Sequence, residues 1–109
     1  MIQTVTPEQA QGLIERGEVE VIDVREPHEW AGGHIAGARL VPLEQLRTNA
    51  KATLARDGVL FVCAAGVRSQ TAARVAASAG LTRIYSLGTG TRGWVKVGLP
   101  LVNNLSVAV

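Results

Sequence analysis

The segment Val59-Leu60-Phe61-Val62 constrains the fold of this chain more than any other part of the sequence. All four residues are apolar, whereas a strand with one face in water alternates between apolar and polar side chains. A continuous apolar run of this length is typical of a strand covered on both faces, as in parallel sheets with helices on each side. The segment therefore predicts a buried strand in an α/β fold.

The rest of the 109-residue chain alternates between helix and strand signals. Thr6 and Pro7 predict the start of a helix, which should run to about Arg16 and stop at Gly17. The alternation predicts one domain with a mainly parallel sheet of about five short strands and helices on both faces, followed by a C-terminal tail at 102–109. The further strands are expected at 19–24, 38–41 and 84–87, and the further helices at 26–30, 43–55, 67–79 and 92–97.

Charge is distributed unevenly along the chain, although the net charge is only +2. All nine acidic residues lie at or before Asp57, and the stretch 58–109 contains five basic residues and no acidic one. A site in this second half should therefore favour an anion. Nucleic acid is a weak candidate for that anion, because the basic residues are dispersed and only 4% of the residues are aromatic.

The sequence gives no sign of a membrane span or of secretion. The first four residues lead into polar residues without the apolar region of a signal peptide, and no stretch approaches the about 18 apolar residues of a membrane span. The single cysteine, Cys63, cannot form an intrachain disulfide, so we expect a reducing, cytoplasmic location. No cofactor or metal is expected, because His28, His34 and Cys63 lack the paired spacing of zinc ligands.

Cys63 follows the apolar strand directly and precedes small residues, Gly66 and the start of a helix. Ligands of open α/β sheets bind beyond the carboxyl ends of the strands. The N–H groups at a helix N-terminus, together with Arg68, favour the thiolate form of such a cysteine. Asp23 ends a neighbouring strand at the same edge and is expected to hold Arg68 or the loop backbone. The alternative is that Cys63 is a small buried hydrophobic residue, as most free cysteines are.

Several motifs accompany the loop that begins with Cys63. They are Asp23-Val24-Arg25-Glu26, Glu29-Trp30, Gly33-His34-Ile35-Ala36-Gly37-Ala38, Pro42, the loop Cys63-Ala64-Ala65-Gly66-Val67-Arg68-Ser69, Gly93-Trp94 and Gly98-Leu99-Pro100. In this order they resemble the motifs of rhodanese-like domains, from about Thr4 to Leu101. The resemblance implies a rhodanese-like three-layer α/β domain.

The same resemblance implies a sulfurtransferase that carries sulfur as a persulfide. The Cys63 thiolate would accept sulfane sulfur from thiosulfate or a similar anion and pass it to cyanide or to a thiol, including that of an acceptor protein. Asp23 and Arg25 would orient the loop and pair with acids such as Glu29. The residues whose backbone would cradle the persulfide are Ala64, Ala65, Gly66, Val67, Arg68 and Ser69.

Two segments depart from the family pattern. Ala64 and Ala65 are uncharged where many active members carry a basic residue, which weakens the case for thiosulfate as a good substrate. The turn Gly88-Thr89-Gly90-Thr91 also differs from the usual one, and we expect only a local effect.

Other functions fit the sequence less well than a sulfurtransferase does. A non-catalytic rhodanese-like binding module, or a sulfur relay dedicated to one partner, stays open, although Cys63 and Arg68 argue against an inert module. A redox sensor would lack a second cysteine to resolve a sulfenic acid. A cysteine phosphatase would have five residues between cysteine and arginine, whereas this loop has four. The GxGxxG pattern at 88–93 lacks the following strand and acidic residue of a dinucleotide site.

Overall fold

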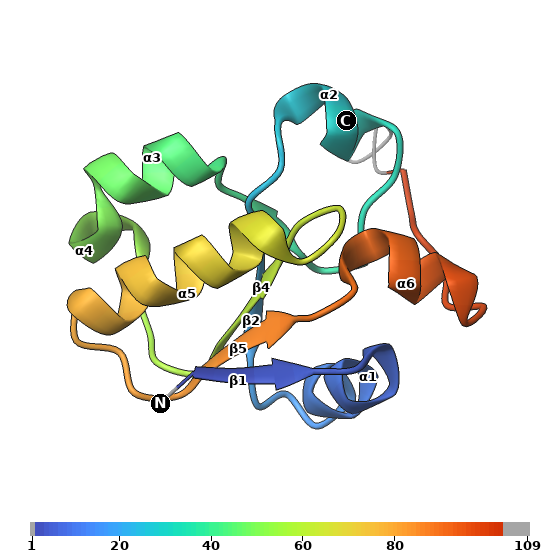
Figure 1. Ribbon diagram of the computed structural model, residues 1–109, viewed down its shortest axis with the longest axis horizontal. Coiled ribbons are helices and arrows are strands. Elements are labelled where there is room, and N and C mark those ends of the chain that lie inside the picture. Colours follow the sequence, from blue (N-terminus) through green and yellow to red (C-terminus); the bar gives the residue numbers. More distant parts are fainter. Residues whose placement is uncertain (1, 104–109) are drawn as a thin grey trace.

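A five-stranded parallel sheet forms the centre of the structure, a computed structural model that describes residues 2–103 (Figure 1). The strand order is β1-β5-β4-β2-β3, and every pair of neighbours is parallel. This arrangement confirms the predicted parallel sheet. The strands are β1 (Ile2–Val5), β2 (Glu20–Asp23), β3 (Arg39–Leu40), β4 (Val59–Val62) and β5 (Ile84–Leu87).

Helices cover both faces of the sheet, which confirms the three-layer architecture (Figure 1). One face packs against the buried side chains of α3, α5 and the segment that follows α4, and the other packs against those of α1 and α6. Helix α2 lies beyond the carboxyl ends of the strands. The helices are α1 (Pro7–Glu15), α2 (Pro27–Ala31), α3 (Leu43–Thr48), α4 (Ala50–Thr53), α5 (Val67–Ser78) and α6 (Gly90–Lys96).

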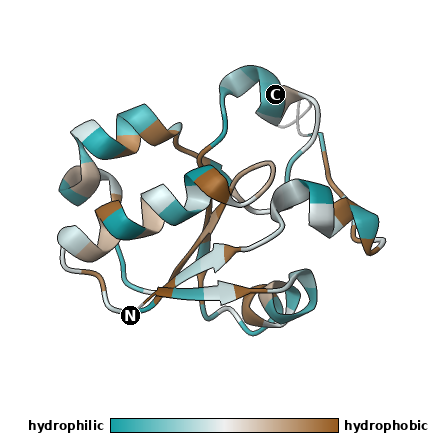
Figure 2. Cartoon of the chain, in the orientation of Figure 1, coloured by the Kyte–Doolittle hydropathy of each residue, from teal (hydrophilic) through white to brown (hydrophobic). Residues whose placement is uncertain are grey.

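Strand β4 is the most deeply buried element, as its sequence predicts. All four of its residues are completely buried, and Figure 2 shows the strand as a hydrophobic ribbon through the middle of the domain. Val59 and Phe61 pack in the apolar cluster on the α5 side, and Leu60 and Val62 pack in the cluster on the α1 side. Apolar contacts on both faces are therefore the physical reason for the unbroken apolar run.

Two elements differ from the expectations drawn from the sequence. Strand β1 was not predicted, because Gln3 and Thr4 are exposed and the strand forms only by pairing with β5 at the edge of the sheet. The single helix predicted over 43–55 was wrong. It is divided into α3 and α4 at Asn49, whose φ of −135° and ψ of 41° lie outside the helical region.

The sheet register places the ends of β2, β4 and β5 next to one another. Asp23 pairs with Val62, the residue before Cys63, and Ser86 pairs with Phe61. Of the tail expected at 102–109, Val102 pairs with His34, and residues 104–109 lie outside the described part. No helix in the described part is both long and apolar enough to cross a membrane.

Candidate active site

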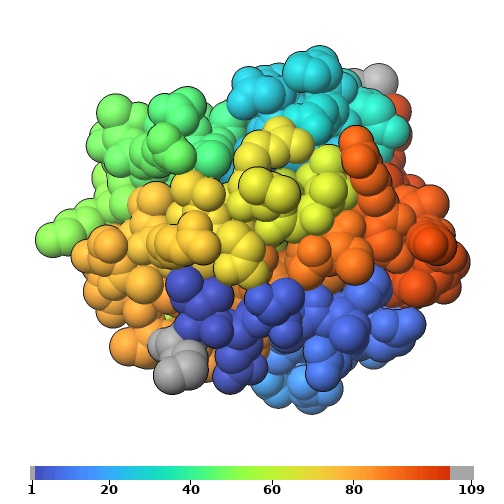
Figure 3. All heavy atoms as spheres, in the orientation of Figure 1, coloured from blue at the N-terminus to red at the C-terminus, as the bar shows by residue number. Residues whose placement is uncertain are grey.

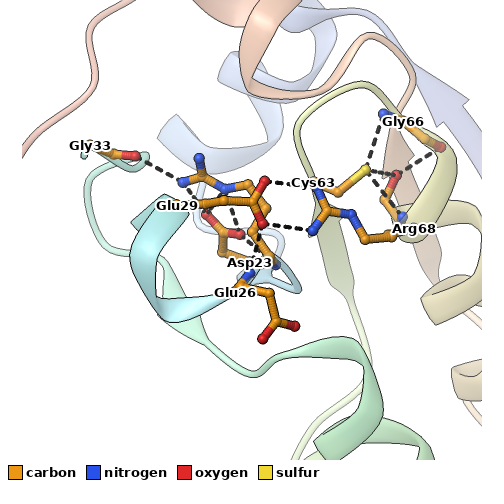
Figure 4. Close-up of polar contacts among 9 residues, drawn as sticks. Asp23, Glu26, Glu29, Gly33, Cys63, Gly66 and Arg68 are labelled. Atoms are coloured by element: carbon orange, nitrogen blue, oxygen red, sulfur yellow. Dashed lines mark hydrogen bonds and ion pairs between the residues drawn. The ribbon is translucent and has the colours of Figure 1, made fainter. Parts of the chain in front are cut away.

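Cys63 follows β4 and lies at the base of the loop that leads into α5. Its side chain is 1% exposed. Its Sγ accepts hydrogen bonds from the backbone N–H groups of Gly66, at 3.0 Å, and of Ser69, at 3.3 Å (Figure 4). Two main-chain donors therefore converge on one sulfur atom, which is the arrangement that stabilises a negative charge there.

The loop closes against the turn that follows β5. Gly66 is the N-cap of α5 and has a φ of +99°, a left-handed conformation that favours glycine. A Cβ atom at Gly66 would overlap the carbonyl oxygen of Gly88, and one at Gly90 would overlap the backbone of Ala64. The N–H of Thr91 also donates to the carbonyl of Cys63, at 2.8 Å.

The turn that includes Gly88 and Gly90 therefore supports the loop directly. Its effect reaches beyond the local one that the sequence suggested. Figure 3 shows the loop, in yellow-green, between the cyan surface of α2 and the orange surface of the β5–α6 region. Two glycines after a buried strand can indicate that another segment approaches the backbone closely. The sequence alone does not say which segment that is.

The environment of Cys63 lowers the pKa of its thiol below the ordinary value of 9.0. Burial is the largest single influence and raises the pKa, because it penalises the charged form. Hydrogen bonds from the N–H and hydroxyl of Ser69, and from the backbone of Ala65 and Gly66, outweigh it. A larger fraction of Cys63 is therefore thiolate at neutral pH than for a free cysteine.

A pair of buried hydroxyl groups lies behind the sulfur. Ser69 Oγ is 3.6 Å from Cys63 Sγ, donates to the carbonyl of Gly66 at 3.2 Å, and is 2.8 Å from the hydroxyl of Ser86 on β5. Both serines are completely buried. Ser86 was not identified from the sequence, where its only signal is a small polar residue inside an otherwise apolar strand.

Arg68 points toward α2 and forms a two-point ion pair with Glu29, with N–O distances of 2.7 and 2.9 Å (Figure 4). The hydrogen bond from Arg68 is the main reason why the pKa of Glu29 falls from 4.5 to about 2. The same bond raises the pKa of Arg68. The charge of the loop arginine is therefore already balanced by a carboxylate.

Asp23 pairs with Arg25, so the expectation that it holds Arg68 was wrong. The Arg25 guanidinium donates to both carboxylate oxygens of Asp23, with a shortest distance of 2.8 Å, and to the carbonyl of Gly33, also at 2.8 Å. The side chains of Asp23 and Arg25 are 1% and 7% exposed. Arg25 thus pairs with Asp23 and not with Glu29, and it connects the end of β2 to the segment after α2.

Neither histidine lies in the Cys63 loop, and the contacts of His34 fit a structural role. The ring of His34 stacks on that of Trp30 with centroids 3.5 Å apart, and its Nδ1 lies 3.1 Å from the Trp30 carbonyl. His28 is exposed on α2. Within residues 2–103 there is no group of three or more His, Cys, Asp and Glu side chains that could hold a metal ion.

A shallow groove of about 770 Å³ lies elsewhere, between the α3–α4 segment and α5. Its lining includes Arg47, Lys51 and Arg74 but no residue of the Cys63 loop. The convergence of N–H donors on the sulfur, rather than the size of a hollow, therefore identifies the candidate site.

The model of the Rhodanese-like domain family matches residues 6–97, and this chain belongs to that family. It is 35% identical over 95 residues to the thiosulfate sulfurtransferase GlpE of Pseudomonas aeruginosa, covering 87% of this chain and 86% of that protein. The crystal structure of a rhodanese-related protein from Thermoplasma volcanium superposes with a TM-score of 0.82 and 32% identity, covering 92% of this chain and 97% of that one. Family and relatives support a sulfurtransferase-like role.

A relative from Bacillus subtilis, named uncharacterized protein YqhL, is 42% identical over 77 residues, which are 71% of this chain. The match spans only 61% of that protein's length, and a match to a Synechocystis relative spans 59%. The chain therefore corresponds to about six-tenths of the length of these two relatives.

Proposed function

We propose that this domain is a sulfurtransferase in which Cys63 carries sulfane sulfur as a persulfide. The observation that supports this most strongly is the pair of N–H donors, from Gly66 and Ser69, within 3.3 Å of the cysteine sulfur. Fixed donors of this kind stabilise an anionic sulfur without having to reorganise during the reaction. Because a single unpaired cysteine must stay reduced, we expect the reaction to take place in the cytoplasm.

The reaction has two balanced steps. In the first, the Cys63 thiolate attacks the outer sulfur of a donor, a new S–S bond forms, and the donor's own bond to that sulfur breaks, with the electron pair leaving on sulfite or on a thiolate. In the second, cyanide or an acceptor thiolate attacks the outer sulfur of the persulfide. Thiocyanate or a new persulfide departs, and the Cys63 thiolate is regenerated.

The loop is suited to hold the negative charge of the persulfide. Its N–H groups lie at the N-terminus of α5, where the helix dipole adds positive potential. In this proposal the backbone of Ala64 to Ser69 cradles the outer sulfur, while Asp23 and Arg25 stabilise the shape of the segment that carries Glu29. No cofactor is required, because the cysteine itself carries the sulfur.

The rim of the loop favours a donor with less charge than thiosulfate, which is a dianion. Ala65 is exposed and Val67 is 75% exposed, so apolar groups surround the entrance. Arg68 is the only charged side chain of the loop, and Glu29 balances it. A small dianion therefore gains little from electrostatic attraction here. We expect organic persulfides, or the persulfide of a partner protein, to load Cys63 faster than thiosulfate does.

The test is intact mass spectrometry of the reduced protein after incubation with thiosulfate or with an organic persulfide. Wild-type protein should gain about 32 Da, one sulfur, and Cys63→Ser should gain nothing. Cyanide should then remove the added mass and produce thiocyanate. If neither donor adds a cyanide-labile sulfur to folded wild-type protein, the proposal is wrong and a non-catalytic binding module becomes the better hypothesis.

A further inference from the structure

Ser86 places a hydroxyl group in the apolar layer between β5 and α5. It lies on the same face of β5 as Ile84, which packs in a cluster with Phe61 and Ala72. Ser86 is completely buried, and Ser69 is its one side-chain hydrogen-bond partner among the described residues. A buried hydroxyl costs free energy unless it is hydrogen-bonded, so this contact explains how a serine is tolerated there.

The other contacts of Ser69 favour one direction for this hydrogen bond. A serine hydroxyl can donate one proton and accept two. Ser69 donates to the Gly66 carbonyl, which can only accept, and its oxygen accepts from the thiol of Cys63. Either hydroxyl can be the donor in the 2.8 Å contact; when the Ser69 proton goes to the Gly66 carbonyl, Ser86 is the donor.

We propose that Ser86 is a positioning residue for Cys63: its hydroxyl donates to Ser69 Oγ and so directs the Ser69 hydroxyl to donate toward the ionised sulfur. When the thiol loses its proton to solvent, Ser69 loses a donor and can turn its own proton from the Gly66 carbonyl to the sulfur. Ser86 donates to Ser69 in both states. Accepting that bond polarises the Ser69 hydroxyl and makes it a better donor.

The charged groups near the sulfur do not replace this contact. Arg68 interacts with Cys63 through its charge, but its guanidinium is bound to Glu29. Asp23 and Arg25, at the end of β2, are bound to each other. The Ser69 hydroxyl and the backbone N–H groups of Gly66 and Ser69 are therefore the groups that contact the sulfur directly.

The experiment measures ionisation of the only cysteine, from the pH dependence of its alkylation by iodoacetamide. Ser69→Ala should raise the thiol pKa by about one unit, the effect of one hydrogen bond to a charged group. Ser86→Ala should raise it by roughly a third of a unit, because it acts only through Ser69. In the Ser69→Ala background, Ser86→Ala should have no further effect. Ser78→Ala, an exposed position of α5, is the control and should leave the pKa unchanged.

A second pair of variants tests the same inference if Ser86→Ala fails to fold. Ser86→Thr and Ser86→Val have nearly the same shape, but only Thr keeps a hydroxyl. Thr should preserve the wild-type thiol pKa and Val should raise it. An unchanged pKa in folded Ser86→Ala, equal values for Thr and Val, or an equal shift with and without Ser69 would overturn the inference.

The inference rests on the proposed function for its role in sulfur transfer, but its measurement does not. Alkylation reports ionisation of Cys63 whether or not the protein accepts sulfur. A raised pKa in Ser86→Ala together with no loading of the wild type would support the hydroxyl contact and refute the sulfurtransferase. Sulfur loading of the wild type together with an unchanged thiol pKa in Ser86→Ala would support the sulfurtransferase and refute the role of Ser86.

Discussion

Two polar networks meet at the Cys63 loop, and they differ in charge and in their distance from the sulfur. On the α2 side, Glu29 balances Arg68 and Asp23 balances Arg25. Beneath the loop, the Ser69 hydroxyl and the backbone N–H groups contact the sulfur itself, and the Ser86 hydroxyl contacts that of Ser69. The difference indicates that the ion pairs determine the shape of the loop, whereas neutral dipoles determine the charge state of the cysteine.

This division is reasonable in energetic terms. A buried cation beside the sulfur would have to be removed from water, and the lost hydration offsets much of its attraction for a thiolate. Backbone N–H groups are held in place by the fold and need no such compensation. Pairing Arg68 with Glu29 keeps that positive charge at the edge of the loop, where it supports the fold without competing for the sulfur.

Gly66→Ala should have the largest effect, because Gly66 belongs to both the loop turn and the set of donors to the sulfur. The new Cβ would overlap the Gly88 carbonyl in a left-handed conformation, so the loop must move. We expect sulfur loading to fall by more than about 100-fold and stability to fall by about 3 kcal/mol. Mass spectrometry and chemical denaturation measure the two effects.

Gly80→Ala is the matched control for this variant. Gly80 has a similar φ, +104°, but a Cβ there meets nothing within 4 Å. Gly80→Ala should lower the free energy of unfolding by about 1 kcal/mol, because of the left-handed backbone alone, and leave sulfur loading unchanged. Wild-type loading by Gly66→Ala would contradict the role given to the loop backbone.

Asp23→Asn tests the buried ion pair and should have the next largest effect. It leaves the Arg25 guanidinium buried without its counter-charge, which should cost about 3 kcal/mol in the free energy of unfolding. If the ion pairs only shape the loop, the thiol pKa of the folded variant should change little. Glu20→Gln, in the more exposed pair with Arg39, is the control and should cost less than about 1 kcal/mol. An equal cost for both would contradict the structural role of the buried pair.

Glu29→Gln should have a smaller effect that depends on pH. The pKa of Glu29 is lowered to about 2, so its pair with Arg68 contributes stability above the ordinary carboxyl pKa of 4.5 and loses it as the pH falls toward 2. Because the pair is partly exposed to solvent, we expect about 1 kcal/mol or less near neutral pH. Denaturation curves of wild type and variant should converge in acid. If the difference in stability between wild type and Glu29→Gln stays constant down to about pH 2, this ion pair is not its cause.

The local features of the fold and site were accessible from the sequence. The apolar run predicts β4, and Gly66 and the pattern after it predict the start of α5, because these signals lie within a few consecutive residues. The register of the sheet also confirms that Asp23 ends at the same edge as Cys63. The role of Cys63 as a sulfur carrier stays a prediction that loading experiments decide.

The pairwise contacts of the site were not accessible. Arg68 and Glu29 are 39 positions apart, and nothing in their spacing says that they meet. Arg25 was expected to pair with an acid such as Glu29, and its pairing with Asp23 depends on the bend of the chain after β2. Ser86 lies in a strand whose neighbours become known only when the sheet register is known. Tertiary packing determines these partners, so sequence patterns of short range cannot identify them.

The smallest expected effect comes from adding charge to the rim of the loop, which tests why this site should be a poor acceptor of thiosulfate. Ala65 is exposed, so Ala65→Lys adds a cation at the entrance without disturbing the donors to the sulfur. Loading from thiosulfate should rise by about threefold at low ionic strength and return to the wild-type rate at high salt. Loading from an organic persulfide, whose persulfide group carries at most one negative charge, should rise less.

Ala77→Lys, at an exposed position farther along α5, adds the same charge away from the loop and is the control. If Ala65→Lys alone accelerates loading from thiosulfate, the neutral rim limits the encounter with small dianions, and a less charged or protein-bound donor supplies sulfur to Cys63 better. If both lysines act equally, net charge explains the rate. If neither does, attraction at the rim is not limiting, and the ion pair of Arg68 with Glu29 has no part in selecting the donor.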